Sequence, residues 1–256
     1  MRIGISIWPE ILNAPEFLKL KDLEFKDIEV HTNDDEKFKA FLLDYAKKLG
    51  LRFSVHCPHA YYDANVNFCS DKPEVMENSD FWLKKSIKYA KELDARHIII
   101  HPDILKDISR QDALIILESH LKNNLKLLDK SQRILIENMP DDRYGLSTPE
   151  EFKDFLKRFD DRVAVCWDVG HEIHRFRNQN FEFPKLLGQR IKEVHISGVV
   201  NFNDHYPLTK GNLDLAGCME SLKKINYKGA IIFEILTKNP ADIIESKKEI
   251  ERFIKN

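Results

Sequence analysis

The amino-acid sequence predicts a single (β/α)₈ barrel, and three observations lead to this fold class. Short apolar, β-branched runs alternate with longer amphipathic stretches from one end of the chain to the other, which makes eight strand–helix units. A length of 256 residues is ordinary for one such barrel, so we expect one domain over residues 1–256. No Gly-x-Gly-x-x-Gly or Walker loop follows an expected strand, which leaves a doubly wound open sheet without support.

The expected strands are nearly continuous apolar runs, typical of parallel strands that are covered on both faces. They are Arg2–Ile7, Asp27–His31, Leu51–His56, His97–His101, Ile134–Glu137, Arg162–Asp168, Ile191–Ile196 and Ala230–Ile235. In a barrel of βα units the carboxyl ends of all strands meet at one mouth, where barrel enzymes place their catalytic groups. We therefore expect the functional residues at those ends.

The expected helices carry apolar residues at helical spacing. They are Asp35–Leu49, Asn78–Leu93, Arg110–Leu128, Pro149–Phe159, Leu213–Ile225 and Pro240–Ile254, while the helices after the first and sixth strands have weak patterns. Thr148 precedes Pro149 and two glutamates, which predicts a capped helix start. Gly50 is expected to end a helix, and His120 is expected on a solvated helix face.

The composition excludes several classes of protein. Forty Lys and Arg against 42 Asp and Glu give a net charge of −2, so no global field attracts a polyanion. The four cysteines form no Cys-x-x-Cys pair, which predicts reduced thiols. No apolar run approaches the roughly 18 residues of a membrane span, and the amino terminus lacks a signal-peptide core. We expect a cytoplasmic protein that needs no membrane and has no evident obligate protein partner.

Polar side chains stand where the expected strands end. They are His31, His56, His59, His101, Glu137, Asn138, Asp168, His171, His195 and Glu234. Burying carboxylates and imidazoles together is costly unless a cation neutralises them, and a mixed nitrogen and oxygen donor set suits Zn²⁺, Mn²⁺ or Fe²⁺. The sequence predicts a divalent metal site at the mouth, with His31, His56 and Asn138 at the substrate. The turn at Pro58 leaves open whether His56 or His59 is the ligand.

Three segments resemble motifs of the xylose isomerase-like barrel superfamily, which includes endonuclease IV and many sugar isomerases and epimerases. They are the WDVGHEIH, IENMP and DHYPLTKGNLD stretches, and the resemblance extends from Ile3 to about Phe253. The segment Pro58-His59-x-x-Tyr62-x-x-Asn65 is similar to a segment of endonuclease IV. This resemblance implies that Tyr62 contacts DNA beside a lesion.

The endonuclease IV resemblance also implies up to three metal ions. Their ligands would be His59, His101, Glu137, Asp168, His171, His195, His205 and Glu234. Asp204 stands directly before His205, whereas the family has its aspartate two residues before the histidine, and Asp204 is expected near the substrate. Acids in the run Asn33–Glu36 occupy the place of residues that the nuclease presents to DNA, and they would repel phosphates.

The sugar-enzyme branch of the superfamily implies a different use of the same mouth. Its single-metal set would be Glu137, Asp168, His195 and Glu234, with His171 in contact with the substrate. Glu137 and Glu234 would then be the acid and base that move a proton beside a carbonyl.

The number of ligand-type residues favours, by a small margin, a metal-dependent hydrolase similar to endonuclease IV that acts on phosphodiester bonds of abasic DNA. The alternative is a sugar or sugar-phosphate isomerase or epimerase with one divalent metal. Glu137 and Glu234 are the expected catalytic residues. We expect one to three divalent ions, Zn²⁺ before Mn, Fe or Co, and either abasic DNA or a small sugar as the substrate.

Overall fold

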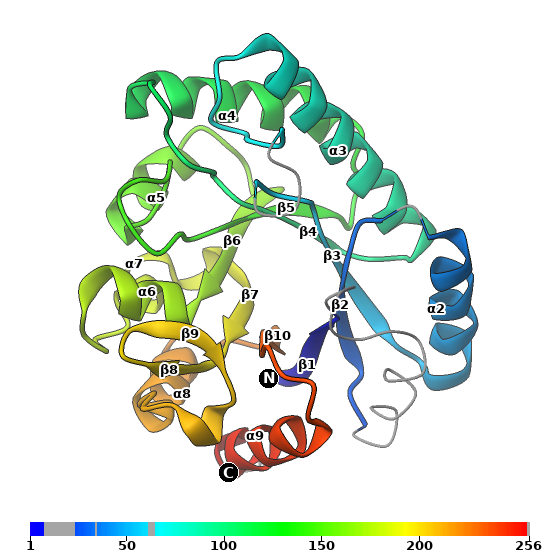
Figure 1. The fold of residues 1–256 in the computed structure, drawn as a ribbon, viewed down its shortest axis with the longest axis vertical. Coiled ribbons are helices and arrows are strands. Elements are labelled where there is room, and N and C mark those ends of the chain that lie inside the picture. Colours follow the sequence, from blue (N-terminus) through cyan, green and yellow to red (C-terminus); the bar gives the residue numbers. More distant parts are fainter. Residues whose placement is uncertain (8–23, 34, 61–64, 255–256) are drawn as a thin grey trace.

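The computed structural model describes residues 1–7, 24–33, 35–60 and 65–254, and within them eight parallel strands close into a barrel (Figure 1). The strands are β1 (Arg2–Ile7), β2 (Asp27–His31), β3 (Arg52–His56), β4 (His97–Ile100), β5 (Arg133–Glu137), β6 (Val163–Asp168), β7 (Ile191–Ile196) and β10 (Ala230–Phe233). Their order around the barrel is β1-β10-β7-β6-β5-β4-β3-β2, and β2 pairs with β1 to close the ring. The predicted (β/α)₈ barrel is confirmed.

The helices lie outside the strands, as Figure 1 shows. They are α2 (Glu36–Leu49), α3 (Pro73–Glu92), α4 (Arg110–Leu125), α5 (Pro149–Leu156), α6 (Val169–Phe176), α7 (Glu182–Leu187), α8 (Leu215–Lys224) and α9 (Pro240–Ile254). Helix α3 begins five residues before its predicted start, because Pro73 occupies the first turn, where its fixed φ is favourable. The weak sixth helix is two short helices, α6 and α7. Residues 8–23, which follow β1, lie outside the described residues.

The predicted helix ends are confirmed at two places. Thr148 accepts a hydrogen bond from the backbone of Glu151, whose side chain accepts one in return from the backbone of Thr148. This capping box satisfies two amide groups that the first turn of α5 would otherwise leave unpaired. Gly50 ends α2 with φ 62°, a left-handed conformation that glycine adopts without a steric penalty.

Alternate residues of the strands face two different environments. Ile98, Ile134 and Val165 belong to the large apolar cluster between barrel and helices. Ile99, Leu135, Ala164 and Cys166, one position out of step, form a separate small cluster. Because successive strand residues point to opposite faces, this second set fills the lumen of the barrel. Glu137, Asp168 and His195 share its alternation and therefore point inward at the mouth.

A hairpin that the sequence did not predict follows β7. Strands β8 (Gly198–Val200) and β9 (Asn203–Tyr206) pair antiparallel, and Figure 1 shows them beside α6. Asn201, Phe202 and His205 have positive φ values of 50°, 67° and 62°. None of the three is glycine, so no glycine signal marks this turn in the sequence.

The expectation for His120 was wrong. His120 is 6% exposed, its ring lies edge-on to Phe68, and its Nδ1 is 3.9 Å from Asp80. Helix α3 and the segment before it cover this face of α4, so the position is in the core. The four cysteines are free and buried. Within the described ranges, no helix has the length and apolar character that a membrane crossing requires.

Candidate metal centre at the mouth of the barrel

The carboxyl ends of the strands carry most of the polar residues that were predicted for the site. His31, His56, Glu137 and Asp168 are the last residues of β2, β3, β5 and β6, while His195 lies in β7 and His101 and Glu234 directly follow β4 and β10. Neighbouring strands place His31 beside His56 and Asp168 beside His195 in the sheet register. The barrel therefore brings together residues that are far apart in the sequence.

Four of these side chains form one compact buried group: Glu137, Asp168, His195 and Glu234. One candidate ligand atom of each lies within 4.8 Å of the others. His195 Nδ1 is 3.3 Å from Glu137 Oε2 and 3.4 Å from Glu234 Oε2. None of the four residues is more than 3% exposed. This is the arrangement that the sugar-enzyme resemblance implied.

The atoms of this group suit a divalent cation. His195 Nδ1 and Glu137 Oε2 are buried and face each other, yet neither has a hydrogen-bond partner among the described residues. The opposite ring nitrogen, Nε2, is 2.9 Å from Glu29 Oε2 and donates its proton there. Burial alone would lower the pKa of His195, but Glu234, Glu29 and Glu137 raise it well above its ordinary value, so Nδ1 stands at a place that attracts positive charge, either a proton or a metal ion. One imidazole nitrogen and three carboxylates match the donor preferences of Zn²⁺, Mn²⁺, Fe²⁺ or Co²⁺.

Hydrogen bonds hold both the side chain and the backbone of Asp168 in place. Its carboxylate caps α6 by accepting a hydrogen bond of 2.6 Å from the backbone of His171. The side chain of Asn138 forms two hydrogen bonds with the backbone of Asp168. Its amide oxygen accepts from Asp168 N at 2.7 Å, and its amide nitrogen donates to Asp168 O at 2.9 Å. Asn138 was expected to contact substrate, but it is fully buried and its amide serves the backbone of Asp168. The geometry assigns it a positioning role.

Replacing Asn138 with leucine is expected to destabilise the fold and to weaken metal binding. The backbone N–H and C=O of Asp168 would lose their partners, at about 1–3 kcal/mol for each buried group left unsatisfied. Loss of an outer-shell contact typically lowers metal affinity 10–100-fold. Urea unfolding and Zn²⁺ titration would measure the two effects.

Asn124→Leu is the matched control, because Asn124 is also fully buried and binds Asp80 and the backbone of His120 on α4, away from the mouth. The control should lose stability and keep its Zn²⁺ affinity. Equal Zn²⁺ affinities in the two variants would contradict the positioning role of Asn138.

A second group of ligand-type side chains surrounds Glu137 from β3 and β4. His101 Nε2 and His56 Nε2 are 3.3 and 3.5 Å from Glu137 Oε2. His31 stacks on His56 with 4.8 Å between ring centroids. His59 lies with its ring 4.1 Å from that of His101 and forms a further candidate group with His101 and Asp103. Both His56 and His59 are thus close to His101, and His56 contacts Glu137.

A third group lies between α6 and the hairpin. Asp204 Oδ2 is 3.4 Å from His171 Nε2, and its Oδ1 is 3.5 Å from His205 Nε2. The Nδ1 atoms of the two imidazoles contact backbone carbonyl oxygens, of Asn138 at 2.8 Å and of Glu234 at 3.0 Å. The acid directly before His205 therefore reaches both imidazoles.

Burial and charge act against each other at these carboxyl groups. Burial alone would raise the pKa of Glu137, but the nearby imidazoles of His101, His195 and His171 hold it well below its ordinary value. The pKa of Glu234 is also lowered, because His195 outweighs burial. The pKa of Asp168 is raised to about 7 by burial, and the charges of Glu137, Asp204 and Glu234 add to this effect. Such crowding of negative charge favours a bound cation.

The imidazoles on the β2 to β4 side differ in charge. Burial alone would lower the pKa of His56, but Glu137, Glu29 and Glu234 raise it to about 9. Burial, with the nearby His56, lowers the pKa of His31 to about 3. Burial and the imidazoles of His101 and His56 lower the pKa of His59 well below its ordinary value. The neutral imidazoles of His31 and His59 can donate and accept hydrogen bonds or bind a metal.

Glu29 and Asp103 are buried residues at the site that were not predicted from the sequence. Glu29 stands two residues before His31 on β2, so the two side chains share the inward face. Strict alternation from His31 back along the strand would have found Glu29. Tyr62, expected to contact DNA, lies outside the described residues.

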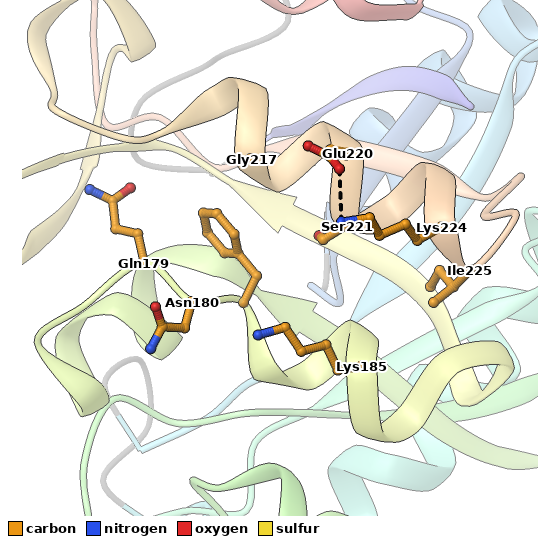
Figure 2. Close-up of a pocket in the computed structure, with 9 residues that line it drawn as sticks. Gln179, Asn180, Lys185, Gly217, Glu220, Ser221, Lys224 and Ile225 are labelled. Carbon is orange, nitrogen blue, oxygen red and sulfur yellow. Dashed lines mark ion pairs between the residues drawn. The ribbon is translucent and has the colours of Figure 1, made fainter.

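A separate surface pocket of about 320 Å³ lies between α7 and α8 (Figure 2). Figure 2 shows Gln179, Asn180 and Lys185 on one side, with the ion pair of Glu220 and Lys224 on the other. None of the predicted site residues lines it. The pocket is therefore distinct from the groups at the barrel mouth.

The closed parallel barrel and the buried His, Asp and Glu groups at its mouth define a (β/α)₈ barrel protein with a candidate metal centre. The chain belongs to the xylose isomerase-like TIM barrel family, whose model matches residues 17–255. The family that the sequence motifs suggested is confirmed.

Individual relatives cover most of the chain. An uncharacterized protein of Methanocaldococcus jannaschii is 31% identical over 281 residues, with 100% of this chain and 97% of the relative covered. A probable endonuclease 4 of Staphylococcus epidermidis is 24% identical and covers 78% of this chain and 66% of its own length.

Solved structures share the fold. A D-tagatose 3-epimerase-like protein has a TM-score of 0.86 at 24% identity and covers 100% of this chain and 97% of its own. The IOLI protein, solved with a bound zinc atom, has a TM-score of 0.75 at 16% identity and covers 99% of this chain and 96% of its own.

Proposed function

We propose that this protein is a metal-dependent epimerase or isomerase that acts on a sugar or a closely related polyhydroxy carbonyl compound. The observation that carries the proposal is the pair of buried carboxylates, Glu137 and Glu234, which both contact the same imidazole nitrogen of His195. The likeness in fold to a D-tagatose 3-epimerase-like protein supports this alternative over the hydrolase that the sequence motifs slightly favoured.

Glu137, Asp168, His195 and Glu234 would hold one divalent cation. The bound cation would supply Lewis acidity that polarises the carbonyl and hydroxyl oxygens of a sugar. A zinc atom in the IOLI structure is consistent with this assignment. His195 Nδ1 and Glu137 Oε2 are buried without a hydrogen-bond partner among the described residues, and they are the atoms that most directly indicate a cation site.

The remaining chemistry belongs to the protein's own side chains. One carboxylate of the Glu137 and Glu234 pair takes the proton from the carbon beside the carbonyl, and the other carboxyl group returns a proton to that carbon or its neighbour. Return to the opposite face of the same carbon inverts its configuration, and return to the neighbouring carbon moves the carbonyl. Burial of both residues keeps bulk water away from the reacting carbon.

The imidazoles at the mouth would bind the hydroxyl groups of the substrate. His31 and His101 are buried beside His56, and His171 stands on the opposite side of Glu137, where its Nδ1 is 3.2 Å from Glu137 Oε1. Side chains that both donate and accept hydrogen bonds match a chain of hydroxyl groups, each of which does the same.

The hydrolase hypothesis keeps one specific observation in its favour. The groups of His56, His101 and Glu137, and of His171, Asp204 and His205, offer places for additional cations, and clustered metals are typical of phosphodiester hydrolysis. The number of bound metals separates the two functions.

The decisive experiment combines a metal count with two activity assays on protein purified without chelator. We expect one Zn²⁺ or Mn²⁺ per chain and, for ketoses incubated in D₂O, deuterium at the inverted or isomerised carbon by NMR. Metal-stripped protein is the control and should exchange no deuterium. Two or three metals per chain, with nicking of abasic DNA and no exchange into any ketose, would establish the hydrolase instead.

A further inference from the structure

We propose that Glu29 is a positioning residue for metal binding. Its carboxylate accepts a hydrogen bond from His195 across the lumen of the barrel and so holds the imidazole ring in the orientation that binds the metal. The proposal deepens the proposed function and rests only on its metal centre. Glu29 stands outside the four-residue ligand group, and its role would be carried entirely by His195.

The contact crosses the interior of the barrel. Glu29 lies on β2 and His195 on β7, two strands that are separated in the ring by β1 and β10. Glu29 Oε2 and His195 Nε2 are 2.9 Å apart, and both residues are 0% exposed. Because neither side chain is exposed, water does not compete for this hydrogen bond. The hydrogen bond to Glu29 therefore orients the ring of His195.

The contact also fixes which ring nitrogen carries the proton. An ionised carboxylate can only accept, so Nε2 must donate to Glu29 and carries the proton. Nδ1 is then the nitrogen left for a metal ion, and it is the atom that faces Glu137 and Glu234 at 3.3 and 3.4 Å. Histidine ligands in metal sites are commonly held in this way by a carboxylate on the far ring nitrogen, which also raises their basicity.

A purely structural role for Glu29 fits the geometry less well. Its second carboxylate oxygen, Oε1, is buried with no hydrogen-bond partner in the described part of the chain. Glu193, a buried glutamate two residues before His195, differs in this respect: Ser54 donates to one oxygen, and His97 contacts the other at 2.5 Å. Glu193 therefore has its partners at the floor of the barrel, while Glu29 makes its hydrogen bond to His195 at the mouth.

The comparison of these two glutamates provides the test. Glu29→Leu removes the acceptor, and Glu29→Gln keeps an acceptor of the same size without the charge. Glu193→Gln removes a carboxylate of equal burial from the same lumen without touching His195. Each protein would be stripped of metal, checked for a cooperative unfolding transition, and titrated with Zn²⁺ in competition with a chromophoric chelator.

We expect Glu29→Leu to bind Zn²⁺ about 10–100-fold more weakly than the unaltered protein, which is the usual effect of losing such an outer contact. The Zn²⁺ affinity of Glu29→Gln should lie between those of Glu29→Leu and the unaltered protein, and Glu193→Gln should keep the original affinity. As a second readout, NMR of the Zn²⁺-loaded protein should show the Nε2 proton of His195 shifted downfield by its hydrogen bond to Glu29, and Glu29→Leu should lose this shift.

Unchanged Zn²⁺ affinity in Glu29→Leu, or an equal loss in Glu29→Leu and Glu193→Gln, would overturn the proposal. If Glu29→Leu fails to fold, the comparison of Glu29→Gln with Glu193→Gln decides in the same way. None of these measurements uses a substrate. A protein whose Zn²⁺ affinity depends on Glu29 but that exchanges no proton with any ketose would keep this inference and lose the proposed function.

Discussion

Replacing Glu137 with glutamine is expected to lower kcat for proton exchange into the substrate by at least about 10²–10⁴-fold, the range that one acid–base group contributes. Glutamine has the same size but cannot take a proton at neutral pH. The change also removes a carboxylate from a group in which His56, His101, His171 and His195 all contact Glu137. The rate of deuterium incorporation from D₂O into the reactive ketose measures the effect.

Glu193→Gln is the control for this result as well, because Glu193 is equally buried in the lumen and makes its contacts at the opposite end of the barrel. It should retain the original rate. Rapid exchange in Glu137→Gln, with normal metal content, would show that the proton passes through another group and would remove Glu137 from the proposed acid–base pair.

Removal of the metal is expected to abolish exchange and to lower thermal stability. Without a metal ion, three carboxylates and one imidazole share a buried volume, and their charges do not balance. Metal at about 100 times its dissociation constant adds about 2.7 kcal/mol to the folded state. For a domain of this size we expect a rise in Tm of about 5–10 °C on addition of Zn²⁺ or Mn²⁺ to stripped protein.

The matched control uses a different class of ion. Ca²⁺ and Mg²⁺ prefer all-oxygen ligands, so at the same concentrations they should restore less of the Tm and little activity. A scanning calorimeter and the exchange assay would read both. Full exchange activity in stripped protein with no metal added would refute the metal-dependent mechanism.

The fold was predictable from the sequence because parallel strands buried on both faces leave a strong pattern. The expected and observed bounds of β1, β2 and β7 coincide, and each of the other strands differs by one or two residues at one end. Such runs can hardly be anything but strands when amphipathic helices of more than ten residues separate them. The expected helix after the sixth strand was weak for a physical reason, since two short helices, α6 and α7, share that place.

The site was predictable to the extent that its residues end strands. Glu137, Asp168, His195 and Glu234 came together because the topology of the barrel allows nothing else, and their role as ligands stays a prediction. The hairpin was missed because its left-handed residues, Asn201, Phe202 and His205, include no glycine. The contacts of the Asn138 side chain could not be predicted from the sequence. Its partner is the backbone of Asp168, and every residue has the same backbone groups, so residue types do not reveal such a contact.

The junction at Asp168 has a consequence for how the site moves. Strand β6 ends at this residue and α6 begins at the next one, so no connecting loop separates the barrel from the helix. A loop would give the carboxylate a local opening of its own, with a small free-energy cost. Here the carboxylate can be released only together with the hydrogen bonds of β6 and the first turn of α6. The candidate site therefore belongs to the same cooperative folding unit as the barrel wall, and its geometry should persist for as long as the barrel is folded.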